Sequence, residues 1–296
     1  MRHWLIAIAT GLSVLAAGTP ATAGTEATIL APGVISSDQE EWRISFTPDG
    51  RSAYFARSAD FFPVSRQATI LVSRTTNSGW SAPHTASFSG QYPDIDPFIT
   101  ADGRRLFWSS IRPVDGQPRT DADLWMVEKR RDGRWGEPQH LGAAVNGPAD
   151  ELYPTVTADG TLYFASDRAG GLGGWDIYRS RPGRDGRYGP AENLGAPVNT
   201  DGWEFNPVVV GPLLVFTGLN RAGGYGAGDL WYSAATLGSW STPRNLGPTV
   251  NTALDEYHPS VSPSLDRLYF VRHNYDPWVP GDIYTIRARD LYHRLP

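Results

Sequence analysis

The sequence predicts an all-β fold, a five-bladed β-propeller built from four-stranded antiparallel blades. Three observations predict it. Apolar and polar residues alternate with period two over short runs that are bounded by Gly, Pro and Asp. Glycine and proline are abundant, at 32 and 24 residues, and 11 tryptophans accompany them. One four-strand pattern returns about every 53 residues, a spacing typical of propeller blades.

The first 23 residues predict an export signal. Arg2 and His3 precede the apolar run 4–17, and small residues lead to a cleavage site after Ala23. We therefore expect a signal peptide over 1–23, a propeller domain over 24–296, and a periplasmic or secreted protein. The alternative is a membrane anchor, for which this run is short. No later run reaches the roughly 18 apolar residues of a membrane helix, so we expect no membrane span in the mature chain.

Residues 154–195 give the clearest blade. Its strands and turns follow in order: a short strand 155–157, the turn Asp159-Gly160, a second strand 161–166, a Gly-rich loop 167–174, a third strand 175–180, and a fourth strand 188–194. Strands joined this way form a half-buried antiparallel sheet. This segment therefore serves as the template for the other blades.

The joint between blades is the best repeated motif. Leu-Gly followed by Val-Asn occurs at 141–146, 194–199 and 246–251, and each copy is followed by an acid and then a proline. Looser copies open at 30–36 and 94–97. The blades are predicted over 41–93, 94–150, 151–203, 204–255, and 256–296 together with 27–36. Third strands are expected at 69–73, 123–127, 176–180, 229–233 and 282–286, and fourth strands are expected to open at Trp80, Trp135, Tyr188 and Trp240.

The two ends of the repeat array are complementary. Five inner strands are followed by only four fourth strands, whereas the segment 27–35 resembles a fourth strand that has no blade before it. We expect this N-terminal strand to pair into the last blade and close the ring, because closure removes the exposed edges of an open array. An open or six-bladed array is the alternative.

The run 162–178, LYFASDRAGGLGGWDIY, resembles the WD40-like PD40 repeat. This repeat occurs in the TolB propeller and in bacterial envelope proteins that carry OmpA-type domains. The resemblance covers the whole mature chain and is strongest in the third blade. It implies a propeller fold and residence in the cell envelope. It implies no particular chemistry, because such repeats serve binding proteins and enzymes alike.

Composition argues against some classes of binding partner and against disulfide bonds as a source of stability. The formal net charge is −5 and becomes one unit more negative when Arg2 leaves with the signal. A net negative protein is a poor match for nucleic acid or for an anionic membrane surface. The chain has no cysteine, so core burial and strand ladders must stabilise it. We expect a monomer that binds an envelope protein, a peptide or a glycan.

An acid precedes the innermost strand of every predicted blade: Glu41, Asp94, Glu151, Glu204 and Glu256. These acids should ring the mouth of the central channel, on the face that carries the long second-to-third loops. They form either a cation or polar-ligand site, or acceptors for an Arg or the backbone of a neighbouring blade. Crowded like charges raise a pKa or recruit a cation. A divalent cation in the channel is therefore a hypothesis, and no other cofactor is indicated.

Arginines and aromatics accompany the acids on this face. Arg57, Arg168 and Arg272 lie near the ends of second strands, and they either pair with the acids or recognise an anionic ligand. Trp278 lies in the loop 273–281, and Phe61-Phe62 lies in the loop 58–68. Blades one and five are neighbours in a closed ring, so these aromatics should share a sector. Exposed aromatics suit a sugar or peptide surface, although the loops could also pack on themselves.

Catalytic motifs are sparse, with no Gly-x-Ser-x-Gly, His-Glu-x-x-His, phosphate loop or Cys nucleophile. His258 lies two residues after Glu256, near the expected mouth. The sequence therefore favours a binding or scaffold module whose ligand meets the channel-mouth face. The alternative is a carbohydrate-active hydrolase or lyase, which needs a deep pocket and one carboxylate pair roughly 5–9 Å apart. A protein or peptide ligand instead predicts an open, shallow funnel.

Overall fold

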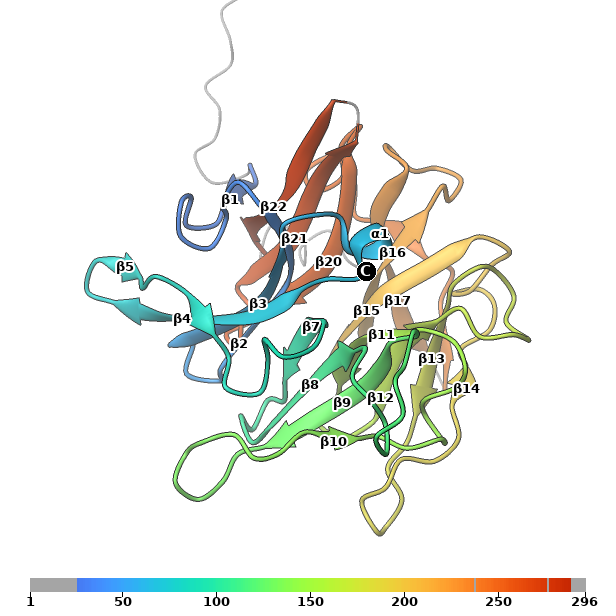
Figure 1. Cartoon of the computed structure of the whole chain (residues 1–296). Coiled ribbons are helices and arrows are strands. Elements are labelled where there is room, and N and C mark those ends of the chain that lie inside the picture. The colour runs from blue at the N-terminus through green and yellow to red at the C-terminus, as the bar shows by residue number, and fades with distance from the viewer. Residues whose placement is uncertain (1–25, 237, 276, 289–296) are drawn as a thin grey trace, which may run out of the picture.

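Five antiparallel sheets surround a central axis and follow one another in chain order (Figure 1). The computed structural model describes residues 26–236, 238–275 and 277–288, and the expected signal peptide at 1–23 lies outside this part of the chain. The predicted all-β, five-bladed propeller is confirmed. No helix among the described residues is long and apolar enough to cross a membrane.

Each blade places its first strand next to the axis and its last strand at the rim. Blade 1 contains β2 (Glu40–Phe46), β3 (Ser52–Ser58), β4 (Thr69–Thr76), β5 (Gly79–Trp80) and β6 (His84–Thr85). Blade 2 contains β7 (Asp94–Ile99), β8 (Arg105–Ser110), β9 (Asp123–Glu128) and β10 (Gln139–His140). Blade 3 contains β11 (Glu151–Val156), β12 (Leu162–Ser166), β13 (Asp176–Ser180) and β14 (Glu192–Asn193).

Blade 4 contains β15 (Trp203–Val210), β16 (Leu213–Leu219), β17 (Gly228–Thr236), β18 (Ser239–Trp240) and β19 (Arg244–Asn245). Blade 5 contains β20 (Asp255–Val261), β21 (Arg267–Tyr275), β22 (Trp278–Arg287) and the N-terminal strand β1 (Thr28–Ile29). The loop after β3, predicted at 58–68, includes the short helix α1 (Phe62–Ser65).

The outermost strands are shorter than the sequence predicts. Trp135 and Tyr188, expected to open fourth strands, make single bridges to Lys129 and Pro182, and the paired strands β10 and β14 follow some residues later. In blades 1 and 4 the outer strand is divided into two short pairs. Proline and glycine after these aromatics interrupt the ladder, which explains the division.

The ring closes as the sequence predicts. β1 pairs with β22 in the register Thr28 to Thr285, and the Leu30 N–H donates to the Ile283 carbonyl at 2.8 Å. In Figure 1 the blue β1 lies beside the red β22. The first described residues therefore supply the fourth strand of the last blade, and every blade has two neighbours.

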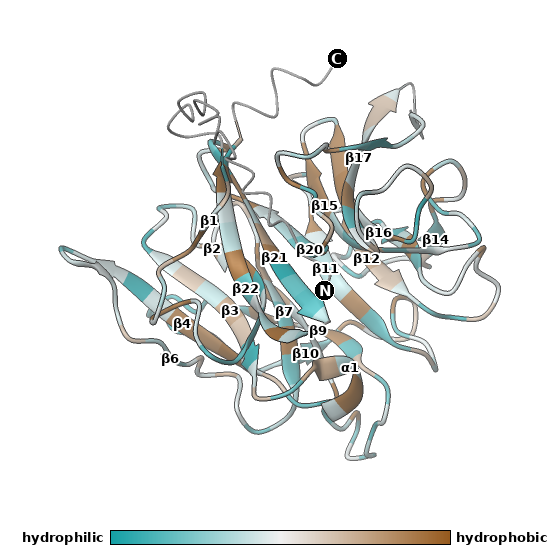
Figure 2. Ribbon diagram, turned by 90° about the horizontal axis from the view of Figure 1, so that it is seen from above, coloured by the Kyte–Doolittle hydropathy of each residue, from teal (hydrophilic) through white to brown (hydrophobic). Residues whose placement is uncertain are grey.

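The core is made between neighbouring blades, and one aromatic position repeats in all of them. A fully buried phenylalanine stands at the same place in each second strand: Phe55, Phe107, Phe164, Phe216 and Phe270. Burial of one such ring contributes roughly 1.5–3 kcal/mol. In Figure 2 the brown, apolar stretches run along the strands and give way to paler, more polar loops.

The short turns between first and second strands share one chemistry. Thr47 donates its hydroxyl to Asp49 at 2.6 Å, the same carboxylate accepts the Arg51 N–H, and Gly50 takes φ = 66°. The Thr-x-Asp-Gly sequence recurs at 100–103 and 157–160 with the same bonds. A left-handed φ favours glycine, so these turns are conformationally determined and structural.

Removal of the N-terminal strand should weaken the whole ring. A chain that begins at Ser37 lacks β1 and Ile35, a side chain that is 0% exposed. Lost burial and lost hydrogen bonds should lower the free energy of unfolding by at least about 3 kcal/mol. Chemical denaturation against a chain that begins at Glu26 measures the difference. Equal denaturation midpoints for the two chains would contradict closure by this strand.

Candidate functional site

The five predicted acids lie inside the fold, where each is bound by an arginine. They are Glu41, Asp94, Glu151, Glu204 and Glu256, all 0–1% exposed, and their partners are Arg57, Arg112, Arg168, Arg221 and Arg272 in the same order. The N–O distances are 2.7–3.0 Å. We call each acid with its arginine a clasp. The clasps bring together eight of the nine predicted site residues, Trp278 being the exception.

Each clasp also fastens its blade to the preceding joint. In blade 3 the Gly147 N–H donates to Glu151 at 2.8 Å, and Arg168 donates to the Val145 carbonyl at 2.6 Å. Asn146, between these two residues, bonds both the N–H and the carbonyl of Leu124 in the previous blade. The joint motif therefore connects two blades. Its asparagine binds the third strand of one blade, and its flanking backbone groups bind the acid and the arginine of the next.

The same contacts recur around the ring, with substitutions where the motif departs. Asn199 and Asn251 bind the third strands of blades 3 and 4 in the same two-bond manner. Ser36 takes this position at the closure and exchanges hydrogen bonds with Ile283. In blade 2 the Trp108 indole donates to Asp94 at 2.8 Å, in addition to the bond from Arg112.

Burial dominates the electrostatics of the clasps. Burial raises the pKa of Glu41 to about 7, although hydrogen bonds from Ser37 and the charge of Arg57 act in the opposite direction. Burial also raises the pKa of Glu151, Glu204 and Glu256 against the same kinds of partner. Each arginine further covers an aromatic ring, as Arg168 does with Phe164 at 5.3 Å.

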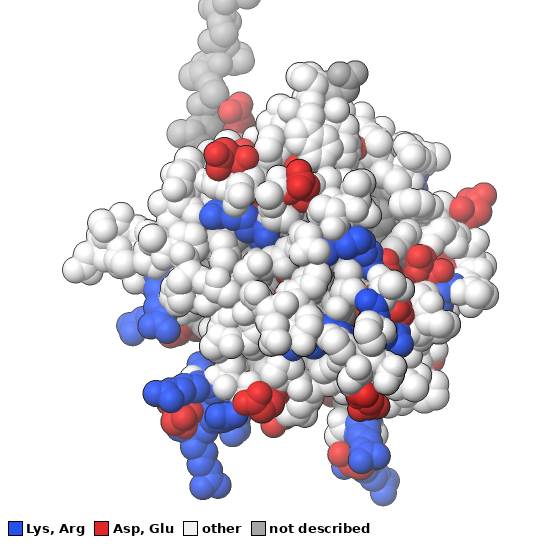
Figure 3. Space-filling view, viewed as in Figure 1, with Lys and Arg blue, Asp and Glu red and all other residues white. Residues whose placement is uncertain are grey.

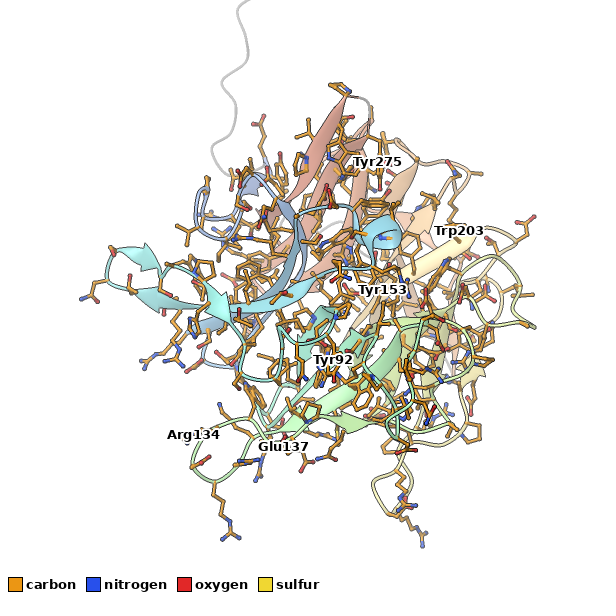
Figure 4. The ribbon with its side chains drawn as sticks, in the orientation of Figure 1. Tyr92, Arg134, Glu137, Tyr153, Trp203 and Tyr275 are labelled. Carbon is orange, nitrogen blue, oxygen red and sulfur yellow. The ribbon has the colours of Figure 1, made fainter. Side chains whose placement is uncertain are left out.

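A hollow of about 400 Å³ opens at the channel mouth, on the face that carries α1. Aromatic side chains dominate its lining: Trp42, Phe61, Phe62, Tyr153, Trp175, Trp203, Phe205, Tyr257, His258 and Tyr275. In Figure 4 Tyr153, Trp203 and Tyr275 gather around the position of α1, whereas Arg134 and Glu137 lie at the periphery. The volume falls in the roughly 300–1,000 Å³ range of small-ligand pockets.

The walls of the hollow are rings packed on rings. Trp175, Tyr153, Phe205 and Tyr257 follow one another with centroid separations of 5.8–6.3 Å. Phe61 packs against Tyr275 at 5.6 Å and Trp278 at 5.7 Å, which confirms that the loops of blades 1 and 5 share a sector. Mutual packing fixes these rings, so the hollow is largely preformed.

The polar groups of the wall are paired with each other. Arg66, which follows α1, binds Asp150 through its two terminal guanidinium nitrogens, at 2.8 and 2.6 Å. This pair joins the loop of blade 1 to the entrance of blade 3. The Tyr257 and Tyr275 hydroxyls lie 3.2 Å apart, and burial raises the pKa of both phenols. The wall therefore presents apolar rings, hydroxyls, and an arginine and an aspartate that are paired with each other.

Two residues after each acid, a second ring of side chains lies closer to the axis: Arg43, Asp96, Tyr153, Asn206 and His258. We call these five residues the axial ring. The strand register shifts at this point in every blade, and the last four residues of the ring are followed by proline. Proline has no N–H for the ladder, so it favours such a bulge. Tyr153 and His258 also line the hollow.

The axial ring carries buried charge. Asp96 is 0% exposed, and His258 Nδ1 lies 3.3 Å from its Oδ1. Arg43 is 1% exposed and donates to the Pro154 carbonyl at 2.8 Å. Burial lowers the pKa of Arg43 to about 10, while the nearby Asp96 favours its charge, so the guanidinium stays cationic at neutral pH. Asn206 lies beside His258, with 3.2 Å between Nδ2 and Nδ1.

Sequence reasoning identified the repeated acids and missed most of the axial ring. Of the five, only His258 was noted near the mouth. The sequence did contain a sign of this ring. The position lies between a repeated acid and, in four blades, a proline, and it holds a different residue in every blade. Within the described residues, no group of three or more His, Asp and Glu side chains is arranged to hold a metal ion.

Neither a protein-family model nor a curated protein matches the sequence. Among solved structures, a glycoside hydrolase matches with a TM-score of 0.60 and 9% identity, over 87% of this chain and 90% of that one. An arabinanase of Bacillus subtilis matches with a TM-score of 0.54 and 11% identity, over 85% and 95%. TolB of Acinetobacter baumannii matches with a TM-score of 0.50 and 15% identity, over 84% and 55%. The chain thus spans about half of that TolB chain, and these likenesses show the propeller fold.

The clasps make stability depend on pH, and Glu41 allows a test. Its pKa is higher in the folded protein than the value of 4.5 expected when unfolded, so the folded state binds more protons between pH 4.5 and 7. The contribution of Glu41 is complete below this window and is lost as pH rises through it. On the order of 2–3 kcal/mol should be lost between pH 4.5 and 8.

Urea denaturation of the wild type and Glu41→Gln at pH 4.5 and pH 8 measures this contribution. The variant should lose less stability across the interval than the wild type, because Gln does not titrate. Glu26→Gln, at an exposed position, serves as the control and should keep the wild-type difference. An equal loss in the wild type and Glu41→Gln would show that Glu41 does not titrate in this interval.

Proposed function

We propose that this protein is an exported, PD40-like binding module of the cell envelope, and that its channel-mouth face docks a polypeptide segment. An apolar side chain of that segment would enter the aromatic hollow. Export and residence in the envelope rest on the sequence pattern at 1–23 and on the resemblance to the PD40 repeat. TolB shares the propeller fold, which is consistent with this resemblance.

The observation that carries the proposal is the concentration of exposed apolar side chains around the hollow. Seven of the nine exposed large hydrophobic residues in the described chain belong to the loops and strand ends of this face: Val64, Leu172, Trp203, Tyr225, Tyr275, Trp278 and Val279. In Figure 3 uncharged residues, drawn white, cover most of this face, with patches of Lys, Arg, Asp and Glu among them. An apolar patch around a preformed pocket is typical of a protein-docking site.

The chemistry of the rim favours a polypeptide over a glycan. Sugars stack on aromatic faces and need many hydrogen-bonding partners for their hydroxyl groups. Here aliphatic Val64, Leu172 and Val279 are 47–82% exposed, and the Arg66–Asp150 pair is already satisfied. Apolar side chains of a peptide match such a surface better.

The alternative is a carbohydrate-active hydrolase or lyase, the class for which two of the compared structures are named. That chemistry needs a carboxylate pair that is available to substrate, with one member poorly compensated by cations. Arginine engages all five predicted carboxylates, so we favour binding. A direct ligand role for Glu204 and Glu256 stays a prediction, and Glu→Gln variants test it. Binding should persist in these variants if the acids serve only the clasps.

Trp203 provides the sharpest test of the hollow, since it lines the hollow and is 46% exposed. A displayed peptide library and a glycan array are screened against the protein, and the affinity of the best peptide is then measured by calorimetry. Trp203→Ala should weaken that peptide by about tenfold or more, the effect expected of an aromatic anchor. Leu265→Ala is the control, because Leu265 is also 46% exposed but lies in a turn of the opposite face.

Two results would reject the proposal. One is selective binding to glycans with no peptide bound. The other is a peptide whose affinity is the same for the wild type and Trp203→Ala while Leu265→Ala weakens it. Trp278→Ala extends the test to the predicted rim residue and should also weaken the peptide.

A further inference from the structure

His258 is one of two residues of the axial ring, with Tyr153, that line the hollow. Its ring lines the hollow and is clamped edge-on by Trp42 at 5.5 Å and Tyr153 at 5.4 Å. Asn206 Nδ2 lies 3.2 Å from Nδ1 of the ring, and Asp96 Oδ1 lies 3.3 Å from the same nitrogen. The orientation of the imidazole is therefore fixed, and the position of its proton depends on these two neighbours.

The amide of Asn206 is oriented by two donors. Its Oδ1 accepts the Thr217 hydroxyl at 3.1 Å and the His258 backbone N–H at 3.2 Å. The amide nitrogen Nδ2 is thereby directed to His258 Nδ1. Because Nδ2 can only donate, a neutral imidazole that bonds to it accepts at Nδ1 and carries its proton on Nε2. Asp96 Oδ1 lies 3.3 Å from the same nitrogen but makes no hydrogen bond to any described residue. The opposite tautomer would set two N–H donors against each other or break both bonds to Oδ1.

Asp96 offers an acceptor to the protonated form of His258. When His258 is protonated, Nδ1–H can donate to Asp96 Oδ1, from which Nδ1 is 3.3 Å away. An imidazolium carries a proton on both nitrogens. Nε2 is therefore protonated in the neutral and in the charged form alike. Arg43 is also near Asp96, whose negative charge favours the charged form of the guanidinium.

We propose that His258 presents an Nε2–H donor to the hollow at every pH, and that it selects ligands with an acceptor oxygen beside their apolar group. This inference rests on the proposed function, in which the ligand is a polypeptide. The acceptor is then a backbone carbonyl next to the side chain that fills the hollow. The hollow would thus recognise both an apolar side chain and the backbone carbonyl beside it.

The tautomer can be measured without any ligand. Two-bond nitrogen–proton spectra of the labelled full-length protein distinguish Nε2–H from Nδ1–H, and His258→Gln assigns the signals. Wild type should show the Nε2–H form at high pH. Asn206→Asp keeps acceptors for Thr217 and the His258 N–H but replaces the Nδ2 donor with an oxygen. This variant should move the proton to Nδ1 or produce the imidazolium. A neutral Nδ1–H histidine in the wild type overturns the inference.

Two small probes test the selection. N-acetyl-L-tryptophanamide carries two carbonyl oxygens beside an indole, and 3-methylindole has none. The wild type should bind the first about threefold to tenfold more tightly, the value of one net hydrogen bond. His258→Phe should abolish this preference and leave the affinity for 3-methylindole within about twofold, because the hollow keeps its apolar wall. His258→Gln, which retains an N–H donor, should keep part of the preference.

The outcomes separate this inference from the proposed function. The same preference in the wild type and His258→Phe overturns the inference and leaves the hollow as a binding site. If Trp203→Ala lowers the affinity for both probes, the hollow is supported as the binding site, independently of the role of His258. If neither probe binds the wild type, the hollow does not take this class of ring, and the selection proposed for His258 is overturned.

Discussion

The ring depends on one repeated interaction. It is the buried ion pair between an acid at the start of each inner strand and an arginine in or just after the second strand. A buried salt bridge adds little net stability, because desolvation offsets the attraction of the two charges. Loss of one partner is costly, however, since it leaves an uncompensated buried charge. Each clasp also binds the backbone of the preceding joint. The interaction therefore fixes how one blade meets the next.

Pairing of the acids within the clasps affects the chemistry of the channel mouth. Their charges are neutralised inside the blades and do not reach the hollow. The channel mouth is then lined by the residues between the clasps, which are aromatic. The lining of the hollow is therefore mainly aromatic although the chain as a whole is acidic. Net charge alone would have given a misleading picture of this face.

The sequence predicted the fold well because local rules and the repeat agree. Alternation, turn chemistry and a regular period all indicated blades, and the unmatched strand at 27–35 indicated closure. The meeting of Phe61 with Tyr275 and Trp278 also followed from closure alone, without any knowledge of side-chain contacts. These inferences needed only topology, which the repeat determines.

The candidate site was harder to predict because it depends on a local irregularity. Strict alternation puts a residue two positions after an acid on the same side of the strand as that acid. The register shift breaks this rule, and Asp96, Tyr153, Asn206 and His258 adopt positive φ at that point. Arg43, which is not followed by proline, sits at the same shift without a positive φ. Proline within a strand was the clue to a bulge, but its effect on side-chain direction required the structure.

Repeated positions and variable positions thus serve different purposes in this chain. Positions that repeat, such as the clasps, the Asn of the joint and the buried phenylalanines, hold the blades together in one geometry. The axial ring repeats only in place, and its five side chains are a cation, an anion, a phenol, an amide and an imidazole. A fold that needed this position for stability would constrain its chemistry as it constrains the acids. The residue type of the axial ring is free to vary, whereas its position beside the preformed hollow is constant. Such positions on a rigid scaffold are suited to ligand recognition.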